Sequence, residues 1–529
     1  MVHHDGTLGH PAWVRWAWIA PASFLALFLV VPLTALAREL GSAALIPELL
    51  NADLWWVAAL AAVQALVSTA LTLLLGVPIS AAVMRYRFPG RALVIALLTV
   101  PFVLPTVVVA LAMKTALGEL IGTGWWLVIA AHVYINIAVV VRIVGARWMR
   151  LDSRLEGSAR TLGATNWQAF RTVTWPAIRA SVVTAAAVVF TFSFTSLGVV
   201  LIAGDGHVRT LESVILRKTS LLLDFPGAAV AALIQALFVG VALVIAARSA
   251  NASGSTASPR LRTLPRAGTA RWAVPLIAVL AAAWVLFPLL GLVSNSITSS
   301  SGFTLRWWTA LMSPTQAMLI AGHPGQALLR SALLALITAV IAATIGSLAA
   351  IAIMRGSAGG RLLSIAAMIP LGISAATIGL GTMLAFGRPP LDLRGVGLLI
   401  PIAHALIAVP LVVAVAAPAL RAADVRPRAV AAMLGASPTR AWLTCFGPTI
   451  GTVAGSAAAL AAAVSFGEFG AASFLARADS LTAPLVIARL LGKPGDALLG
   501  TASALAVALA LATLLLVVMI DRLSQREVR

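Results

Sequence analysis

The sequence predicts an all-α integral membrane protein with about 12 transmembrane helices, arranged as two tandem six-helix repeats. Of its 529 residues, 61% are hydrophobic and only 10% are charged, whereas soluble domains carry about 25% charged residues. Its apolar runs last about 20 residues or more, which suits spanning helices, while the strands of a membrane barrel would give alternating runs of about 10 residues.

The apolar runs fall into two sets of six and give the order of the expected spans. The first set lies near residues 17–37, 55–84, 92–116, 124–144, 177–203 and 228–247. The second set lies near residues 273–294, 327–354, 362–386, 397–418, 449–475 and 498–520. We expect the first run to be an uncleaved span, because it is too long for a secretory signal peptide and no small-residue cleavage site closes it.

The two sets form an internal repeat. Residues other than Ala and Leu recur at a nearly constant offset: Arg85 matches Arg355, and His132, Gly163 and Pro176 match His404, Gly435 and Pro448. Because each half has an even number of spans, the repeats are expected to be parallel and related by a pseudo-two-fold axis along the membrane normal. The expected units are a first half at 1–247, a second half at 272–529 and, between them at 248–271, a flexible linker rich in Ser, Ala, Gly and Pro.

The formal charge of +20 reflects an excess of Arg. Such an excess can indicate nucleic-acid binding, but in a chain with many spans it marks cytoplasmic loops, so we expect no nucleic-acid partner. All the basic loops lie on one side if both termini are cytoplasmic. The single cysteine, Cys445, excludes an intramolecular disulfide and a cysteine-rich metal site.

A polar insert occurs between the fourth and fifth spans of each half, at about 150–178 and 421–450. In the first copy, the spacing of Leu155, Ala159 and Leu162 predicts one face of a short helix, and Gly163 predicts its end. Thr165 is a candidate N-cap of a second short helix, and Pro176 suits the start of the fifth span. We therefore expect each insert to be a helix–glycine turn–helix elbow, polar on its outer surface and anchored by the following span.

These elbows resemble the "EAA" coupling loop of binding-protein-dependent ABC importer permeases. That family's pattern is Glu-Ala-Ala, three residues, Gly, nine residues and Ile-x-Leu-Pro. The matching residues of the first copy are Gly157, Ser158, Ala159, Gly163, Val173, Trp175 and Pro176, and those of the second are Ala429, Val430, Ala431, Gly435, Cys445, Gly447 and Pro448. The Gly and Pro match in both copies, but the acid does not, since Glu156 lies one residue early. We therefore expect the Gly and the Pro to matter, and not Glu156.

The resemblance implies a type I ABC importer-like fold in a bacterial cytoplasmic (inner) membrane. It implies two partners besides the lipid bilayer: a cytoplasmic ABC ATPase homodimer that binds the elbows, and an extracytoplasmic solute-binding protein. The residues implicated in ATPase coupling are Ala159, Leu162, Gly163, Ala164, Phe170, Pro176, Ala431, Leu434, Gly435, Ala436, Trp442 and Pro448. The sequence has no Walker A pattern, so we expect a permease that is not an enzyme and has no cofactor, with ATP and Mg bound by the partner ATPase.

The fused two-half form resembles permeases for thiamine and for ferric iron. The segments 210–235 and 465–475 look closest to the thiamine branch, although "GEFGA" within the second is also similar to sulfate and molybdate permeases. The resemblance therefore favours a thiamine-type organic cation or ferric iron as the transported solute.

An ionisable residue inside a span is costly and suggests a functional site. Glu468 lies deep in an apolar stretch, and its counterpart in the first half is Ser196. It either faces a translocation path together with Ser193, Ser196 and Ser465, or it lies near the membrane surface or caps a broken helix. His132 and His404 are expected to be structural rather than metal ligands, and no metal site is predicted.

Two other function classes are open. A secondary transporter with two six-span repeats would need coupling-ion carboxylates inside its spans and would need no repeated elbow. A membrane enzyme or assembly factor would need a catalytic constellation, and none is evident in the sequence.

Overall fold

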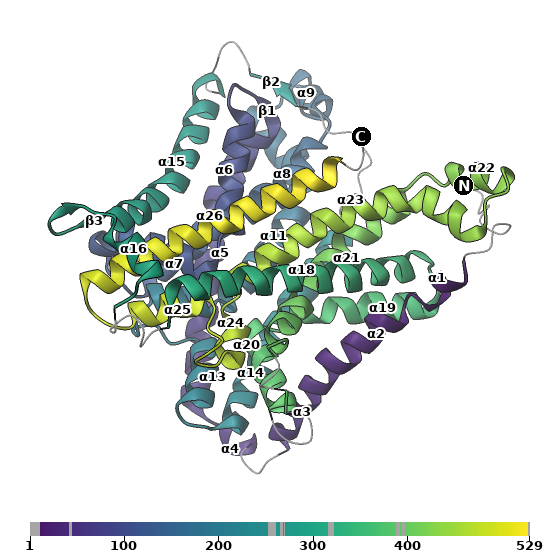
Figure 1. Cartoon of the computed structure of the whole chain (residues 1–529). Helices are drawn as coiled ribbons and strands as arrows, with labels where there is room; N and C mark the ends of the chain where they lie inside the picture. Colours follow the sequence, from purple (N-terminus) through teal and green to yellow (C-terminus); the bar gives the residue numbers. More distant parts are fainter. Residues whose placement is uncertain are drawn as a thin grey trace.

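The protein is described here from a computed structural model of the whole chain (Figure 1). The described residues are 11–41, 45–251, 261–264, 268, 270–315, 322–387, 392–393 and 397–526. Among them, ten helices are long and apolar enough to cross a membrane, and two sharply bent helix pairs raise the number to twelve if each pair is one span. The predicted all-α fold with about 12 spans is thus confirmed.

The first half contains six successive spans joined by short elements. The first span comprises α1 (Ala12–Trp16), α2 (Ile19–Leu25), the π-helical turn η1 (Ala26–Val30) and α3 (Val31–Leu40). Next come α4 (Leu45–Leu49), α5 (Ala52–Arg85), β1 (Tyr86–Arg87), α6 (Arg91–Val103), α7 (Thr106–Ile121) and α8 (Trp125–Met149). The half ends with α9 (Ser153–Thr161), α10 (Asn166–Ala169), the π-helical turn η2 (Phe170–Thr174), α11 (Trp175–Phe194), α12 (Leu197–Ala203), α13 (Leu211–Ser220) and α14 (Phe225–Asn251).

The second half repeats this order. It begins after β2 (Arg262–Thr263) with α15 (Ala270–Ile297), β3 (Thr298–Ser299), β4 (Gly302–Phe303), α16 (Arg306–Met312) and α18 (Pro324–Met354). It continues with α19 (Ala358–Met368), the 3₁₀ turn η3 (Ile369–Gly372), α20 (Ala375–Phe386) and α21 (Leu399–Ala422). The last elements are α22 (Arg426–Met433), α23 (Pro438–Gly467), α24 (Gly470–Leu475), α25 (Ala483–Leu491) and α26 (Asp496–Arg526).

The third span of each half is broken, whereas the sequence predicted continuous runs at 92–116 and 362–386. The bend is 107° between α6 and α7 and 104° between the α19–η3 segment and α20. In the first half, Leu104 is extended because it precedes Pro105, which disfavours helical backbone in the residue before it. In the second half, Ile373 is extended and Ser374 caps α20 by accepting a hydrogen bond from the backbone N–H of Thr377.

The first span of each half packs against the opposite half. In Figure 1, the segment from α1 to α3 lies beside α18 and α19, and α15 lies beside α6. Accordingly, Val14, Phe24 and Leu29 share a buried cluster with α18 and α21, while Val274 and Val285 of α15 are buried with residues of α5, α6 and α8. The sequence repeat therefore divides at the linker, but in the structure each half packs its first span against the other half.

Small residues bring the central spans together at equivalent places in the two halves. A Cβ added to Gly76 would lie 2.8 Å from Cβ of Val140, and a Cβ added to Gly346 would lie 2.6 Å from Cβ of Val412. Backbones that approach this closely leave room only for glycine, as is common between membrane helices. The repeat therefore preserves one helix crossing in α5–α8 and in α18–α21.

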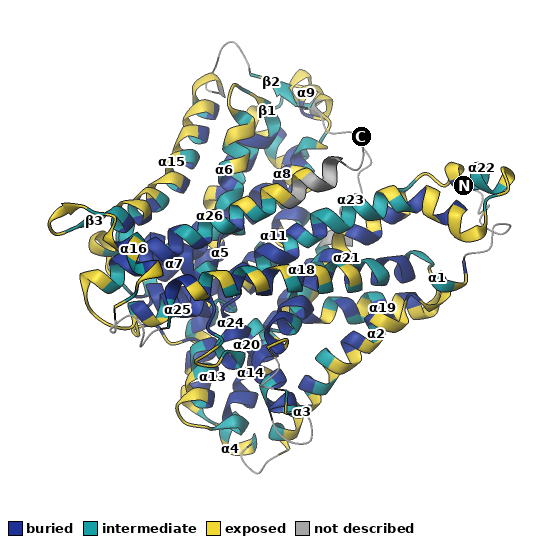
Figure 2. Cartoon of the chain, viewed as in Figure 1, coloured by how far each residue is buried: buried dark blue, intermediate teal, exposed yellow. Residues whose placement is uncertain are grey.

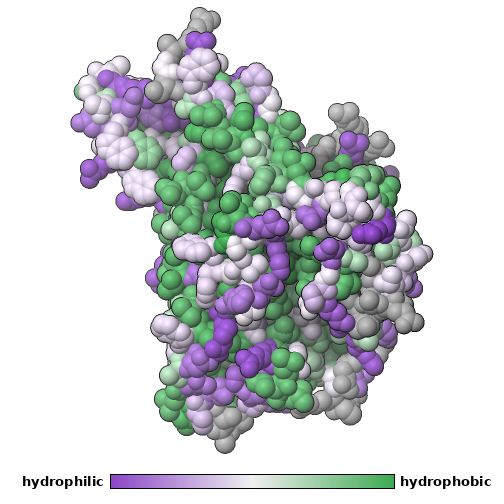
Figure 3. All heavy atoms as spheres, turned by 90° about the vertical axis from the view of Figure 1, so that its left-hand side faces the viewer, coloured by the Kyte–Doolittle hydropathy of each residue, from purple (hydrophilic) through white to green (hydrophobic). Residues whose placement is uncertain are grey.

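The outer surface of the spans is apolar. Figure 2 shows buried residues in the interior and exposed residues on outward helix faces, including much of α15. On α15, Leu276, Val279 and Leu280 are exposed, and the view onto this side shows a hydrophobic band with hydrophilic groups above and below it (Figure 3). An exposed apolar band of this kind is expected where lipid tails surround the protein.

Part of the linker is fixed to the first half, although the sequence predicted a flexible segment at 248–271. The helix α14 continues to Asn251, and β2 pairs in parallel with β1, with Tyr86 opposite Arg262 and Arg87 opposite Thr263. Residues 252–260, 265–267 and 269 lie outside the described part of the chain. The pairing occurs on the side of the molecule that carries α9 and α22, which we call the elbow side; α13 and α25 lie on the opposite, far side (Figure 1).

Candidate coupling elbows and translocation path

The first elbow turns at a glycine, as predicted. α9 is capped by Asp152, whose side chain accepts from the backbone N–H of Arg154. Gly163 has a φ of +86°, and the N–H of Ala164 donates to the carbonyl of Ala159 over 3.0 Å. Thr165 then caps α10 through reciprocal bonds with Gln168. The left-handed turn and the cap together fix the angle between the two helices.

The second elbow has the same backbone with different side chains. Gly435 has a φ of +83°, and the N–H of Ala436 donates to the carbonyl of Ala431 over 3.0 Å. Ser437 caps α23 by accepting from the N–H of Arg440. The equivalence of Gly163 with Gly435 therefore extends to the geometry of the turn.

The outer surface of the elbows is mixed. Polar residues such as Arg154, Arg160 and Arg440 are exposed, as predicted. Leu162 is also 88% exposed and Leu434 82% exposed, together with Leu155 and Met433, whereas Glu156 is buried. The prediction of a polar outer surface is therefore correct only in part, because apolar side chains are exposed at both turns.

The second helix of each elbow continues into the fifth span instead of ending before it. In the first half, the backbone is helical from Asn166 to Phe194 through η2, and Pro176 occupies the start of α11. In the second half, Pro448 lies inside the 30 residues of α23. A proline inside a helix removes a backbone donor, and the wider π-helical turn directly precedes Pro176 in the first half. A movement of either elbow would thus pass directly into a spanning helix.

Glu156 ties the first elbow to a spanning helix and to the linker. Its Oε2 pairs with Arg85 of α5 and, over 2.9 Å, with Arg262 of β2, while its Oε1 accepts from the hydroxyl of Thr174. Burial alone would raise the pKa of Glu156, but the Thr174 hydroxyl and the two guanidinium groups outweigh it and hold the pKa below its usual value. This group was missed because neither Arg85 nor Arg262 is near Glu156 in the sequence.

The second elbow has a different electrostatic arrangement. The residue that takes the place of Glu156 in the repeat is Arg428, which is buried. Arg355, the counterpart of Arg85, donates instead to the backbone carbonyls of Val14 and Arg15. The two elbows therefore share a backbone geometry but differ in the ion pairs and hydrogen bonds that surround them.

The aromatic residues expected at the elbows differ in burial. Phe170 is half-buried and stacks on Trp167, with ring centroids 5.6 Å apart. Its counterpart Trp442 is completely buried between Trp13 and Phe446. The first span crosses onto the second half and covers Trp442, whereas Phe170 stays partly exposed.

Four helix breaks meet between the two halves. A Cβ added to Gly198, at the start of α12, would lie 2.9 Å from Oγ1 of Thr106, and one added to Gly467 would lie 3.1 Å from Cα of Pro105. A Cβ added to Gly470, at the start of α24, would lie 3.1 Å from the backbone N of Ala376, at the start of α20. The α6–α7, α11–α12 and α23–α24 breaks and the start of α20 are therefore in close backbone contact, where a shift of one element would displace the others.

Glu468 lies at one of these breaks and caps α24. Its carboxylate accepts from the N–H of Ala471 over 2.8 Å and from that of Ala472 over 3.0 Å. Nε2 of His404 lies 3.0 Å from Oε2 of Glu468, and Nδ1 of His404 lies 2.8 Å from Oγ of Ser465. This geometry matches the helix-capping interpretation, and it also brings Ser465 to the same buried group.

The equivalent residues of the first half form a neutral group. Nε2 of Gln64 lies 2.7 Å from Nδ1 of His132, and Nδ2 of Asn136 donates to Oγ of Ser193 over 3.4 Å. Ser196 precedes α12, and its side chain makes no capping bond. Among the described residues, no three His, Cys, Asp or Glu side chains gather as a metal site.

A second buried carboxylate was missed by the sequence analysis. Glu212 of α13 is 1% exposed, and its Oε1 accepts from Nε2 of Gln235 over 2.9 Å. Within the described structure, its Oε2 has no hydrogen-bond partner. Burial raises the pKa of Glu212 to about 7; hydrogen bonds with Ser374 and Gln235 oppose this, and the charge of Glu468 adds to it.

Repeat asymmetry is the signal that could have identified Glu212. Its counterpart 272 positions later is Pro484, just as the counterpart of Glu468 is Ser196. The two carboxylates that break the repeat lie close enough for the charge of Glu468 to act on Glu212. Gln235 connects Glu212 to α20 of the second half, because the hydroxyl of Thr377 donates to Oε1 of Gln235.

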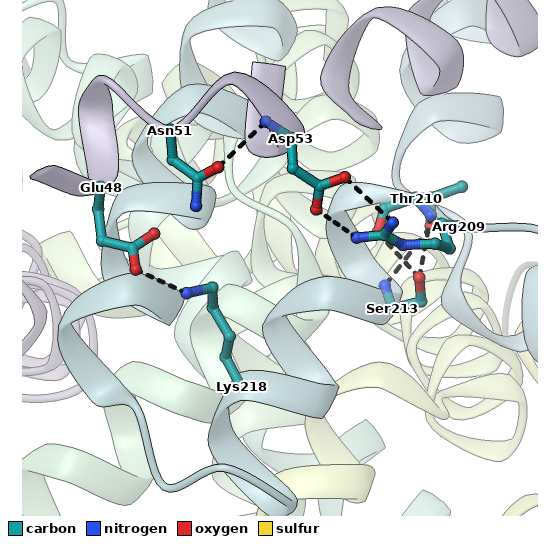
Figure 4. A network of polar contacts seen from close by, with 7 residues as sticks. All are labelled: Glu48, Asn51, Asp53, Arg209, Thr210, Ser213 and Lys218. Atoms are coloured by element: carbon teal, nitrogen blue, oxygen red, sulfur yellow. Dashed lines mark hydrogen bonds and ion pairs between the residues drawn. The ribbon is translucent and has the colours of Figure 1, made fainter. Parts of the chain in front are cut away.

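Ion pairs on the far side fix α13, which carries Glu212. Figure 4 shows Arg209 directed at Asp53, at the start of α5, and Lys218 directed at Glu48 of α4. Lys218 also pairs with Asp224 over 2.6 Å. These contacts hold α13 against α4 and the start of α5.

Comparison with known proteins gives a consistent identity. Residues 73–253, which include the first elbow, match the family described as "Binding-protein-dependent transport system inner membrane component". The thiamine transport system permease protein ThiP of Salmonella typhimurium is 27% identical over 326 residues, or 58% of this chain and 59% of that protein. ThiP of Brucella abortus (strain 2308) is 30% identical over 303 residues, 52% of this chain and 55% of that protein.

The sulfate transport system permease protein CysT of Escherichia coli is matched over more of its own length. It is 32% identical over 232 residues, which are 40% of this chain and 84% of that protein. The matches to the two thiamine permeases, by contrast, span little more than half of each relative. Together with the two six-span repeats and the elbows, these matches show that the chain belongs to the inner-membrane components of binding-protein-dependent transport systems, the permease subunits of ABC importers.

Proposed function

We propose that this chain is the complete membrane pathway of an ATP-driven importer, with the two halves in the roles of two permease subunits. A cytoplasmic ATPase homodimer would bind the two elbows, and a solute-binding protein would deliver the solute at the far side. The observation that carries the proposal is the pair of exposed leucines, Leu162 and Leu434, each on a rigid left-handed turn at equivalent places. Exposed apolar side chains on a fixed geometry are typical of a protein docking site.

The orientation follows from charge. The elbow side carries the Arg-rich inserts, and excess Arg marks the cytoplasmic side of membrane proteins. With an even number of spans, both termini would then be cytoplasmic. The proposed location is a bacterial cytoplasmic membrane.

The transport cycle would use the contact between the four helix breaks. Closure of the ATPase dimer would pull on α9 and α22, and the helices that continue from the elbows into α11 and α23 would carry the movement to the breaks at Gly198 and Gly467. Rocking of the halves would then expose the region between them to alternate sides. Ser193, Ser196, Ser465 and Glu468 are the proposed polar residues of the path.

We propose a cation as the transported solute, with a thiamine-type organic cation favoured over ferric iron. Two buried carboxylates, Glu212 and Glu468, lie between the halves, and the charge of Glu468 acts on Glu212. One oxygen of Glu212 has no hydrogen-bond partner within the described structure. Such a pair attracts a cation and repels an oxyanion such as sulfate. The relatives named for thiamine agree with this preference.

The docking proposal is tested by pull-down of the co-encoded ATPase on the purified chain. Leu162→Asp and Leu434→Asp should each weaken capture, and the double variant should abolish it. Leu221→Asp provides the matched control, because it places the same charge on an exposed leucine of the far side, outside the spans and away from the elbows. Equal capture by the double variant and the unaltered chain would contradict docking at the elbows.

The solute proposal has a separate test. Uptake of radiolabelled thiamine, ferric iron, sulfate and molybdate is measured separately in vesicles that contain the whole complex. Uptake of thiamine and of none of the others supports the organic cation. Uptake of sulfate or molybdate without thiamine would refute a cationic solute while leaving the docking result intact.

A further inference from the structure

A cavity of about 580 Å³ lies on the elbow side, between the end of α5, the end of α8, α9 and the linker strand β2. It is separate from the region between the halves that holds Glu212 and Glu468, and it lies beside the first elbow only. The lining residues that bear on its chemistry are Arg85, Trp148, Leu151, Glu156, Arg160 and Arg262.

The cavity has an excess of positive charge. Arg85, Arg160 and Arg262 are three guanidinium groups, and Glu156 is the one carboxylate among the lining residues. Its Oε2 is already shared by Arg85 and Arg262, and its Oε1 is bound by Thr174. Three guanidinium groups against one carboxylate leave an excess of positive charge along the cavity wall.

The cavity also has an apolar part of its wall. Trp148 is 5% exposed and its Nε1 is buried, so this residue offers a ligand mainly its ring, next to Leu151. The arginines therefore supply the polar contacts, and Trp148 and Leu151 supply the apolar ones.

We propose that this cavity binds a phosphate-bearing anion, either the headgroup of an anionic lipid or a soluble phosphate ester. Guanidinium groups bind phosphate oxygens in pairs with good geometry, and the volume suits a small ligand. The three arginines come from α5, α9 and β2. One bound phosphate would therefore join a spanning helix, the first elbow and the linker.

The site is specific to the first half. In the repeat, Arg428 replaces Glu156, and Arg355 is directed to the backbone of the first span. The linker strand pairs with β1, next to the first elbow. If the elbows bind the ATPase as proposed, a ligand in this cavity would act on the first of the two ATPase contacts only. A small molecule or a lipid could then change the activity of the complex through one half of the pseudo-symmetric chain.

The test uses the full chain in phosphatidylcholine nanodiscs, titrated with inorganic pyrophosphate and followed by its thermal unfolding temperature. We expect a saturable rise in that temperature. Arg160→Ala should weaken the apparent affinity roughly tenfold by removing one charged contact.

Arg154→Ala is the matched control, because Arg154 is an exposed arginine on the same helix, α9, and does not line the cavity. It should leave the affinity unchanged. Equal affinities for Arg160→Ala and Arg154→Ala would overturn the proposal, as would an equal rise in unfolding temperature with potassium chloride at matched ionic strength.

Replacing part of the phosphatidylcholine with phosphatidylglycerol separates the two sources of phosphate. A lipid occupant predicts that phosphatidylglycerol raises the unfolding temperature of the unaltered chain, but not of Arg160→Ala, and that it blocks pyrophosphate. A soluble occupant predicts the same pyrophosphate titration in both lipids. If neither phosphatidylglycerol nor pyrophosphate changes the unfolding temperature, the cavity is not a phosphate site.

Discussion

Gly163 and Gly435 hold the left-handed backbone on which each elbow turns. Nothing in the described structure lies within 4 Å of a Cβ added to either residue, so a substitution there acts through the backbone and not through a clash. For residues other than Gly, Asn and Asp, the left-handed conformation costs about 1–2 kcal/mol. A substitution at either glycine therefore tests the backbone conformation of the turn and not its packing.

We predict that Gly163→Val and Gly435→Val each lower uptake roughly tenfold, because about 1.4 kcal/mol disfavours the docking-competent turn. Asn substitutions at the same positions should be milder. Gly157→Ala is the control on α9, since Gly157 is helical and equally free of neighbours. Uptake in vesicles is the measurement. Retention of full uptake by both Val variants would show that the turn geometry is not needed.

Glu212 gives a prediction about pH. Its pKa is raised to about 7, first by burial, so the carboxyl is largely protonated at about pH 6 and largely ionised at about pH 8. Because the ionised form attracts a cation, uptake of permanently charged thiamine should rise over this range. The Glu212→Gln variant should show lower uptake at about pH 8 and a flatter profile. An unchanged profile in Glu212→Gln would contradict this role of Glu212.

At the scale of single residues, features that depend on neighbours in the sequence were predicted better than contacts between residues far apart in the chain. The N-cap at Thr165 and the stop at Gly163 were correct, because each depends on residues within a few positions. The buried state of Glu156 depends on Arg85 and Arg262, which lie far away in the chain. The same is true of Glu212 with Gln235 and Ser374. Such groups are visible only once the helices are packed.

The elements that depart from the sequence pattern are the third spans. Apolar runs at 92–116 and 362–386 have the length of one helix, and hydropathy alone cannot show a bend of more than 100°. A backbone break inside a membrane is tolerated only where protein covers it, and here other breaks provide that cover. The Pro at 105 was the available signal in the first half.

We predict that Gly379→Ala destabilises the protein by about 1–3 kcal/mol, because the added methyl group meets the backbone of Ala471 at 2.7 Å and forces α20 away from α24. The matched control is Gly240→Ala in α14, where nothing lies within 4 Å of the added Cβ. Thermal unfolding in detergent compares the two. Equal stability of both variants would contradict the close contact between α20 and α24.

At the scale of the whole molecule, the repeat and the number of spans could be predicted from the sequence, but the crossing of the first span of each half could not. Composition shows that Phe24 and Leu29 are apolar, but not whether they face lipid or the opposite half. In the structure, both are buried with α18 and α21. The crossing means that neither half has a complete interior by itself.

We therefore predict that residues 1–255 and 256–529, expressed as separate chains in one cell, assemble into a complex that can be purified through a tag on either piece. The packing of α1–α3 on the second half and of α15 on the first supplies the contact. The piece 1–255 alone should be degraded or aggregate. Independent, monodisperse purification of that piece would contradict the interlocked arrangement.

The central claim is that transport through this chain is driven by ATP through the two elbows. Its most direct test is solute accumulation in vesicles that contain the chain, its co-encoded ATPase and the binding protein, with ATP supplied on the elbow side and no ion gradient. We expect accumulation that requires all three components and is lost in the Leu162→Asp/Leu434→Asp variant. Accumulation driven by a proton or sodium gradient without the ATPase would contradict the claim and favour a secondary transporter.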